Sequence, residues 1–539
     1  MKKTDSGRLF SGLLAGLCAV LLLASCSKGP DVAAYIPKDA ATVINFDLGT
    51  LMQRADVKNI DNISFVKLAR QELRSENPEM AALVDGIIND PTSTGLDLRK
   101  DLTMYLGKDN SSVVLAAVHK RSKFEEFLTG FAERNDSDIT VDDRKDYRLA
   151  VMDGFCVAFN NKVAVMGSGT DVEKNICLEK GESLAGDKLF AEYWANRSEI
   201  SVWLSFKNIF SFIDEMGDEA LTEYTGMPEE YLDDIRNSAM CFNTVFDKGA
   251  IRFVTEMIGI DTGKWEKLYG RKFNDGLLKY FPANSYALMS FAVNTEKMAE
   301  WYSGMKSEIM DFNEPVVGDK SIIDIIKTMD GSLVFSLFDI VANDQTKAMP
   351  LMAVAADLKD ASAFKNIIEE AGFEQRNGFY VIPDFGLGVG VYVAVNDKMA
   401  YITNSEEALQ KFLAGGYGKG LDGSLAAKAK KGYYFYMNLD LAAYPAVLTD
   451  LIPQNIISLL TQYFDYTEVT MNNYSSCNWS ICIKDRKVNS LLSTLRFVDD
   501  HLVDIGSLVA SFGGSDCPEY TEEFYVDDDD LPDDELWDE

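Results

Sequence analysis

Three pairs of segments recur in the same order along this chain, and their recurrence constrains the fold more than any other sequence feature. The partners are separated by 245, then 240, then 236 residues, counted from the first residue of each segment. Small deletions in one copy of a repeat produce such a drift, whereas chance matches do not keep their order. The pairs are YIPKDAATVINFDL (35–48) with YFPANSYALMSFAV (280–293), SKFEEFLTGF (122–131) with SAFKNIIEEA (362–371), and VAFNNKVAVMGSG (157–169) with VAVNDKMAYITNS (393–405).

We therefore interpret the chain as two tandem homologous modules, residues 35–279 and 280–513. The alternative is a pair of unrelated α+β halves that share generic hairpins. Both interpretations place the same kinds of element in each half.

The second pair of segments has the periodicity of an amphipathic helix. Its apolar residues stand at i, i+3, i+4 and i+7, which is one buried face of a helix. Ser122 and Glu125 also have the spacing of a capping box. The third pair places polar turn formers, Asn160-Asn161 and Asn396-Asp397, between apolar strands, and so predicts tight hairpins. The helical apolar positions are Phe124, Phe127, Leu128 and Phe131 in one copy and Phe364, Ile367, Ile368 and Ala371 in the other.

Hairpins interrupted by helices predict an α+β fold of mainly antiparallel sheet with packed helices. Glycines 386, 388 and 390 would share one face of a strand, against which the protein's own helix or another chain would lie. The predicted strands are 42–48, 101–107, 111–118, 200–206 and 240–258 in one half, and 285–293, 331–338, 348–356, 432–438 and 465–484 in the other. Meanders are predicted at 147–168 and 378–403, and helices at 49–70, 264–280, 294–304 and 487–503.

The N-terminus has the layout of a bacterial export signal. A basic start precedes an uncharged stretch, Leu9 to Leu23, that is shorter than the roughly 18–20 residues of a membrane-spanning helix. The sequence Leu-Ala-Ser-Cys that follows resembles the lipoprotein signal, which predicts a signal peptide at 1–25 and lipid attachment at Cys26. An ordinary signal peptide or a buried helix is the alternative. Residues 26–34 are the predicted tether, and Ser27, which is not aspartate, favours the outer membrane over the inner one.

Several stretches of the chain resemble one family. They are YIPKDAATVINFDLGTLM, which starts at Tyr35, TGLDLRKDLTMYLG at 94–107 and VAVNDKMAYITNSEEALQKFL at 393–413. They are similar to the uncharacterised Bacteroidota lipoproteins described as domain of unknown function 4836. The resemblance implies a cell-envelope lipoprotein and carries no established activity, so it assigns no catalytic or binding residue.

The charge of the chain argues against a nucleic-acid partner. The net charge is −33, and removal of residues 1–25 takes away three basic residues and one acidic residue, which gives −35. Phosphate backbones are bound mainly through Lys and Arg, so no nucleic-acid partner is predicted. Residues 514–539 form an acidic tail, which we expect to be disordered and solvated. The alternatives for the tail are docking on a basic partner and weak cation binding.

Signatures of catalysis and cofactor binding are scarce. The chain has two histidines, His119 at a strand end and His501 on the polar side of a helix. Neither belongs to a HExxH motif, and the sequence has no P-loop and no strand-turn-helix glycine pattern of a dinucleotide site. We predict no cofactor, no metal site and no catalytic residue, although a carboxylate pair could be drawn from 85 acidic residues.

Six cysteines follow Cys26, and none forms a CxxC motif: residues 156, 177, 241, 477, 482 and 517. Cys477 and Cys482 fall on one predicted strand, so they should not pair with each other. Isolated thiols are expected, and a long-range disulfide is the alternative in an oxidising compartment.

The sequence thus favours a lipid-anchored envelope protein with a non-enzymatic binding or assembly role at the outer membrane. The membrane, through lipid on Cys26, is one predicted partner, and an envelope protein is another. The competing hypothesis is a histidine-independent envelope hydrolase that acts on glycan or peptide through carboxylates.

Overall fold

The computed structural model describes residues 32–107, 112–135, 137–168, 171–179, 181–215, 229–304, 311–344, 347–382, 389–502 and 505. The predicted signal peptide, Cys26 and the acidic tail lie outside these residues, as do Gly386 and Gly388. Within the described part, no helix is both long and apolar enough to cross a membrane.

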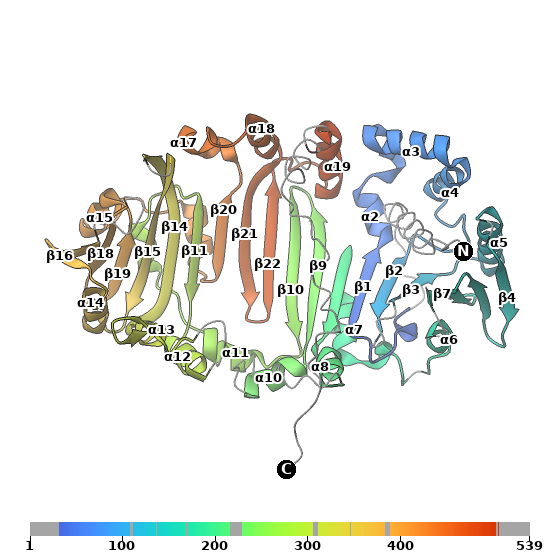
Figure 1. Ribbon diagram of the computed structural model, residues 1–539, viewed down its shortest axis with the longest axis horizontal. Helices are drawn as coiled ribbons and strands as arrows, with labels where there is room; N and C mark the ends of the chain where they lie inside the picture. Colours follow the sequence, from blue (N-terminus) through green and yellow to red (C-terminus); the bar gives the residue numbers. More distant parts are fainter. Residues whose placement is uncertain are drawn as a thin grey trace, which may run out of the picture.

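One antiparallel sheet runs through the whole described chain (Figure 1). In the first half its strands lie in the order β10, β9, β8, β1, β2, β3, β7, β6, β5, β4. These strands are β1 (Thr42–Asp47), β2 (Asp101–Leu106), β3 (Ser112–Ala117), β4 (Ile139–Asp143), β5 (Arg148–Met152), β6 (Phe155–Phe159), β7 (Val163–Ser168), β8 (Ile200–Ser205), β9 (Ala239–Asp247) and β10 (Ala250–Ile258).

The second half repeats this order strand for strand, as β22, β21, β20, β11, β14, β15, β19, β18, β17, β16. Its strands are β11 (Ala287–Ala292), β14 (Met329–Asn343), β15 (Lys347–Leu358), β16 (Glu374–Arg376), β17 (Phe379–Ile382), β18 (Val391–Val395), β19 (Met399–Thr403), β20 (Tyr434–Asn438), β21 (Phe464–Asn473) and β22 (Ser476–Ile483). A separate ribbon pairs β12 (Pro315–Val317) with β13 (Lys320–Ser321).

The two halves join through their corresponding last strands. β10 pairs antiparallel with β22, and Phe253 lies opposite Trp479. Because these two strands occupy the same place in each half and run in opposite directions, the halves are related by an approximate two-fold axis normal to the sheet. The same self-complementary geometry joins the subunits of a two-fold symmetric dimer.

Helices pack on both faces of the sheet and form two apolar clusters in each half. We call the face that carries α5 and α14 the inner face, and the opposite one the outer face. Two inner-face clusters include helical residues. The cluster on the first half contains residues of α2 (Leu48–Arg54), η2 (Val57–Asn62), α3 (Ser64–Glu76), α4 (Pro78–Asn89), α5 (Arg121–Arg134) and α19 (Ser490–Asp500). The cluster on the second half contains residues of α13 (Ile322–Thr328) and α14 (Ala361–Glu370). The outer-face helices are η1 (Val32–Tyr35), α6 (Asp171–Ile176), η3 (Leu184–Gly186), α7 (Lys188–Asn196), η4 (Asp275–Tyr280), α15 (Glu406–Leu413) and α16 (Gly423–Ala429).

The remaining helices lie along the two rims of the sheet in Figure 1, at the ends of the strands. They are α8 (Phe206–Glu215), α10 (Glu229–Arg236), α11 (Thr262–Tyr269) and α12 (Thr295–Gly304) on the lower rim, and η5 (Leu441–Ala443), α17 (Ala446–Thr449) and α18 (Gln454–Tyr463) at the upper ends of the strands.

The structure confirms the α+β class, the antiparallel sheet and the hairpin turns. Asn160 and Asn396 act alike, since each side-chain oxygen accepts hydrogen bonds from the backbone N–H groups two and three residues on. This local geometry closes both hairpins, as expected of asparagine in turns. The module boundaries stay a prediction, because the two halves share one sheet.

Three local predictions are wrong. The helix predicted over 49–70 is divided into α2, η2 and α3, and that over 264–280 into α11 and η4. The predicted capping box is absent, because α5 begins one residue before Ser122, and the Glu125 carboxylate pairs with Arg148 instead. Of the predicted tether, only residues 32–34 are described, and there η1 buries Val32 and Ala33.

Gly95, in the TGLDL stretch, holds the start of α5 against the sheet. Its carbonyl accepts the N–H groups of His119 and Lys120, its φ is 87°, and a Cβ there would lie 2.2 Å from the Phe124 nitrogen. We expect Gly95→Ala to lower the free energy of unfolding by at least about 2 kcal/mol, since backbone strain and a backbone clash add. Gly154→Ala, with φ of 82° but no atom within 4 Å of the added Cβ, is the matched control. Urea unfolding followed by circular dichroism measures both, and equal losses would contradict the role of the close approach.

Candidate functional site

A continuous row of apolar side chains crosses the inner face of the sheet. Directly opposed residues in paired strands share a face, so the pairing register identifies the row. Every member except Thr244 is an apolar aliphatic or an aromatic residue. From β17 to β6 the row consists of Tyr380, Val393, Ile402, Val354, Phe335, Met289, Phe435, Val469, Trp479, Phe253, Thr244, Ile200, Phe46, Leu102, Ala116, Ala164 and Phe159.

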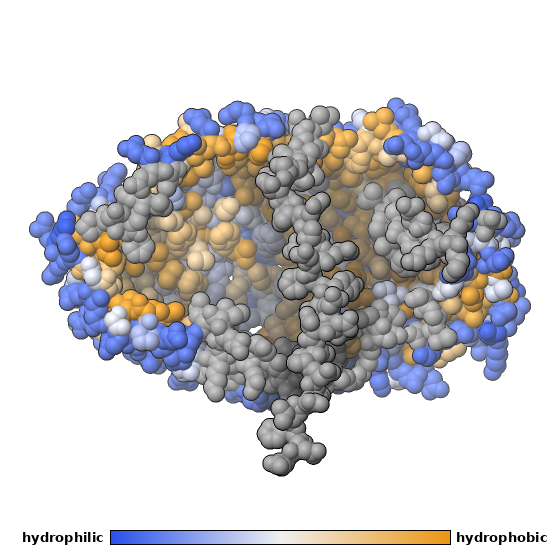
Figure 2. Space-filling model, viewed as in Figure 1, coloured by the Kyte–Doolittle hydropathy of each residue, from blue (hydrophilic) through white to orange (hydrophobic). Residues whose placement is uncertain are grey.

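Helices cover this row at its two ends but leave side chains exposed in the middle. Phe159 is fully buried and Val393 likewise, whereas Trp479 is 45% exposed and Met289 36%. Other exposed apolar side chains on the same face are Leu106, Phe242, Met352 and Met437. Figure 2 shows this face as a hollow lined with hydrophobic residues and bordered by hydrophilic ones. Large contiguous apolar surfaces are uncommon on soluble monomers, so this face is a candidate interaction site.

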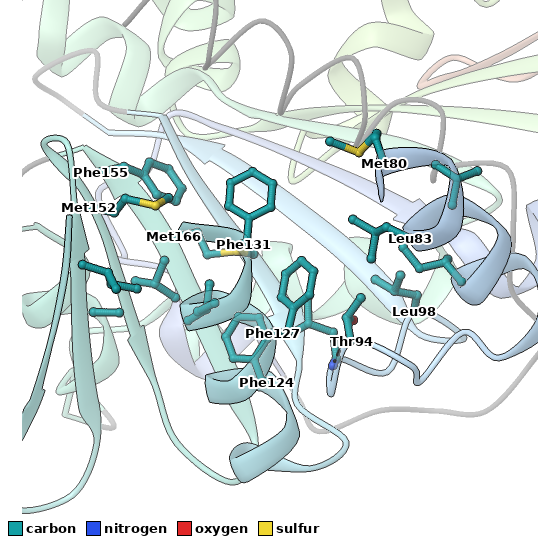
Figure 3. Close-up of a pocket in the computed structure, with 17 residues that line it drawn as sticks. Met80, Leu83, Thr94, Leu98, Phe124, Phe127, Phe131, Met152, Phe155 and Met166 are labelled. Atoms are coloured by element: carbon teal, nitrogen blue, oxygen red, sulfur yellow. Dashed lines mark hydrogen bonds between the residues drawn. The ribbon is translucent and has the colours of Figure 1, made fainter. Parts of the chain in front are cut away.

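At one end of the row the inner face forms a partly open apolar cavity of about 120 Å³ (Figure 3). Helices α4 and α5 form one wall, and strands β5, β6 and β7 form the other. Thr94 is its one polar lining residue, and the Thr94 hydroxyl accepts a hydrogen bond from the Leu96 N–H. The other lining residues are Met80, Leu83, Val84, Ile87, Leu96, Leu98, Phe124, Phe127, Leu128, Phe131, Ile139, Ala150, Met152, Phe155, Val157 and Met166.

The lining of the cavity favours an apolar ligand over water molecules. A buried water needs two to four polar partners, and an apolar cavity of roughly 150 Å³ stays dry and binds small hydrocarbons. The methionines Met80, Met152 and Met166 have flexible side chains that adapt to different apolar shapes. The site therefore suits an apolar group such as part of an acyl chain.

Local sequence explains the helical wall. The predicted apolar positions of α5, from Phe124 to Phe131, face the cavity as expected of one face of a helix. Helix α4 begins at Pro78, its first turn is capped by the Asn77 side chain, and its cavity residues follow the same helical spacing. The Phe124 ring meets Phe159 edge to face, with centroids 5.3 Å apart, and so ties the helix to the sheet.

Sequence reasoning missed the exposed middle of the row. The signal was present in β10, where Ile251, Phe253 and Met257 alternate with Arg252 and Glu256. Such alternation indicates that one face is apolar. It does not indicate that helices cover only the ends of that face, because the cover comes from distant segments.

The two histidines lie at the ends of different elements. His119 is exposed just after β3, and His501 follows the last residue of α19, where its ring lies 4.9 Å from that of Phe497. Among the described residues, no group of three or more His, Cys, Asp or Glu side chains could hold a metal ion.

None of the described cysteines, residues 156, 177, 241, 477 and 482, forms a disulfide. Cys477 and Cys482 share β22 and do not pair, as predicted, while Cys517 lies outside the described residues. Burial raises the pKa of the Cys241 thiol to about 12, which suppresses the reactive thiolate.

Burial raises the pKa of two carboxyl groups in the described chain, Asp101 and Asp357. They belong to different halves, on β2 and β15, so they form no acid pair of the kind that a glycosidase uses. Asp101 faces Arg197 at 2.5 Å, and Asp357 accepts the Ser332 N–H at 2.6 Å. Both carboxyls therefore have structural partners.

Asp357 makes a pH-dependent contribution to stability. Because burial raises its pKa in the folded state, the folded protein holds the proton more tightly, and stability falls as pH rises from the unfolded pKa through the folded pKa. We expect Asp357→Asn to raise the melting temperature at pH 7, with the gain shrinking below the unfolded pKa near 4. Thermal unfolding at several pH values measures it, and a constant difference at all pH values would contradict this assignment.

Fold and site together define a class of protein: an α+β sheet protein of two equivalent halves with an apolar inner face. The family described as Domain of unknown function (DUF4836) matches residues 33–491, and the chain belongs to that family.

No curated protein matches the sequence. Among solved structures, "Structure of crystal form III of TP0453" is similar with a TM-score of 0.25 and 10% identity, and covers 43% of this chain and 81% of that one. "Structure of crystal form IV of TP0453" has a TM-score of 0.24 and 9% identity, and covers 42% of this chain and 79% of that one. Similarity at this level carries no argument about fold or function.

Proposed function

We propose that this protein is a lipid-anchored, non-enzymatic protein of the outer membrane that binds the acyl chains of lipids on the inner face of its sheet. The observation that carries the proposal is the apolar row, which is exposed in the middle around Trp479 and Met289. Whether the body faces the periplasm or the outside stays open.

Acyl chains fit this surface better than a protein partner does. The middle strands pair on both sides, so their backbone groups are already used and cannot accept an added strand. The row offers side-chain contacts with little hydrogen bonding. Each methylene buried there contributes about 0.8 kcal/mol, so a long chain gains several kcal/mol before the cost of ordering it.

The predicted lipid anchor would keep the protein beside a source of acyl chains. Lipid on Cys26 would stand six residues before Val32, which is already buried in the folded body. Six extended residues reach roughly 20 Å, so the body would stay beside the membrane that supplies acyl chains. The two carboxyls whose pKa is raised by burial lie in different halves, and no group of side chains in the described residues could hold a metal ion, so neither supports the hydrolase hypothesis.

Two measurements test the proposal. In cells fed an alkyne-labelled palmitate, the wild-type chain should become labelled and a Cys26→Ala variant should not. Equal labelling of the two chains would contradict lipid attachment at Cys26. The purified full chain, stripped of lipid, should bind cis-parinaric acid saturably, with enhanced fluorescence. Absence of saturable binding would contradict the acyl-chain site.

A further inference from the structure

A second cavity lies on the outer face of the second half, on the opposite side of the sheet from the apolar row. Its volume is about 510 Å³, within the range of small-molecule sites. Strands β20 and β21 form its floor, α16 forms one wall, and the segment 283–286 that precedes β11 lines another side. Its chemistry differs from that of the apolar cavity, because tyrosines and polar side chains dominate the lining.

Tyrosine rings provide flat surfaces in this cavity. The rings of Tyr436 and Tyr466 have centroids 5.6 Å apart, and Tyr286 stacks on Tyr444 at 4.3 Å. Among the described residues, the hydroxyls of Tyr286 and Tyr436 have no hydrogen-bond partner, and burial raises the pKa of both. They are therefore neutral hydroxyls that are available to a ligand.

The lysine of the cavity is neutralised by a neighbouring glutamate, while the Asp422 carboxylate stays exposed at the rim. Lys428 donates to the Glu468 carboxylate at 2.5 Å, and the same carboxylate accepts the Tyr434 hydroxyl at 3.1 Å. The Lys428 ammonium also lies over the rings of Tyr434 and Tyr466. A bound cation would find that position taken, and an anion would find the lysine already paired.

The first half of the chain shows that the fold does not require this cavity. By strand pairing, Tyr436 opposite Glu468 corresponds to Trp203 opposite Cys241. Counted from the aspartate that caps each helix, Asp422 or Asp187, Lys428 corresponds to Tyr193.

The first-half residues Tyr193, Trp203 and Cys241 are at most 3% exposed, and Phe190 closes over Trp203 with ring centroids 5.1 Å apart. In the second half, the same positions carry a lysine, a tyrosine and a glutamate around an open space. An apolar core has thus been exchanged for a polar lining at one equivalent place, at a cost in buried apolar packing.

We infer that this second cavity binds a neutral pyranose saccharide. The apolar face of a sugar ring packs on the tyrosine rings, and its hydroxyls find the Tyr286 and Tyr436 hydroxyls and the exposed polar side chains of Asn284 and Asp422 at the rim. A neutral ligand suits the paired charges, and a polar one suits the lining. The saccharide site does not rest on the acyl-chain proposal, because the two sites lie on opposite faces.

The test uses the full chain in a detergent without a sugar headgroup. Maltohexaose, cellohexaose and chitohexaose are titrated by calorimetry, with hexanoate and inorganic phosphate as apolar and anionic probes. We expect the wild type to bind at least one oligosaccharide saturably. Tyr436→Ala should lower the affinity at least about tenfold. Tyr436→Phe, which keeps the ring, should lower it less.

Tyr474→Ala is the matched control, because this half-buried tyrosine follows β21 away from the cavity. It should bind as the wild type does, and all variants should keep the wild-type melting temperature and parinaric acid binding. No binding of any oligosaccharide, equal binding by Tyr436→Ala, or competition by hexanoate or phosphate would overturn the inference.

Discussion

Replacement of Trp479 by aspartate is expected to weaken the binding of cis-parinaric acid by roughly a hundredfold. Trp479 lies at the centre of the apolar row, where β22 pairs with β10, and its ring is 5.1 Å from that of Phe253. An acyl chain over this position would remove water from the new carboxylate, which costs several kcal/mol, and each 1.4 kcal/mol is a factor of ten. Fluorescence titration of the stripped full chain measures the effect.

Leu451→Asp is the control for this substitution. Leu451 has a similar exposure, 47% against 45% for Trp479, but follows α17 at the rim rather than lying on the sheet. The control should bind the probe as the wild type does. If both variants bound equally well, the middle of the row would not be the binding surface.

Phe124→Ala is expected to lower the free energy of unfolding by about 3–5 kcal/mol. The Phe124 side chain is 1% exposed, packs edge to face on Phe159 and forms part of the cavity wall. Its removal loses apolar contacts and enlarges the existing cavity, and both effects destabilise. Urea unfolding followed by circular dichroism measures the change.

Leu68→Ala, at a position on α3 that is 60% exposed, should change the same free energy by less than about 0.5 kcal/mol. A loss of less than about 1 kcal/mol in Phe124→Ala would show that the core around the cavity relaxes. In that case the cavity would not be a preformed site.

Most of the secondary structure was predictable from local signals in the sequence. The turns at Asn160 and Asn396 are local, because a side chain bonds to its own backbone two and three residues on. The apolar face of α5 is also local, since its spacing depends only on the pitch of a helix. The predicted capping box is absent because the Gly95 carbonyl accepts the Lys120 N–H, which places the start of α5 before Ser122. Gly95 lies more than 20 residues before that helix, so a local sequence pattern could not predict this contact.

The candidate sites depended on contacts between distant residues. Phe253 and Trp479 are separated by more than 200 residues, and only the register of β10 on β22 places them together. The tyrosine cavity likewise joins α16, β20 and β21 with the segment 283–286. Neither site has a motif, because its members share no sequence spacing.

The sequence by itself determined the duplication, the α+β class and the alternation of apolar residues along each strand, because these follow from recurrence and from helix and strand periods. Tertiary structure alone decided that two halves merge into one sheet, that helices leave its inner face open in the middle, and that equivalent positions hold a closed core in one half and a polar cavity in the other. The physical reason is that burial is a property of packing between distant segments. An apolar residue has the same appearance in a sequence whether a helix covers it or leaves it exposed.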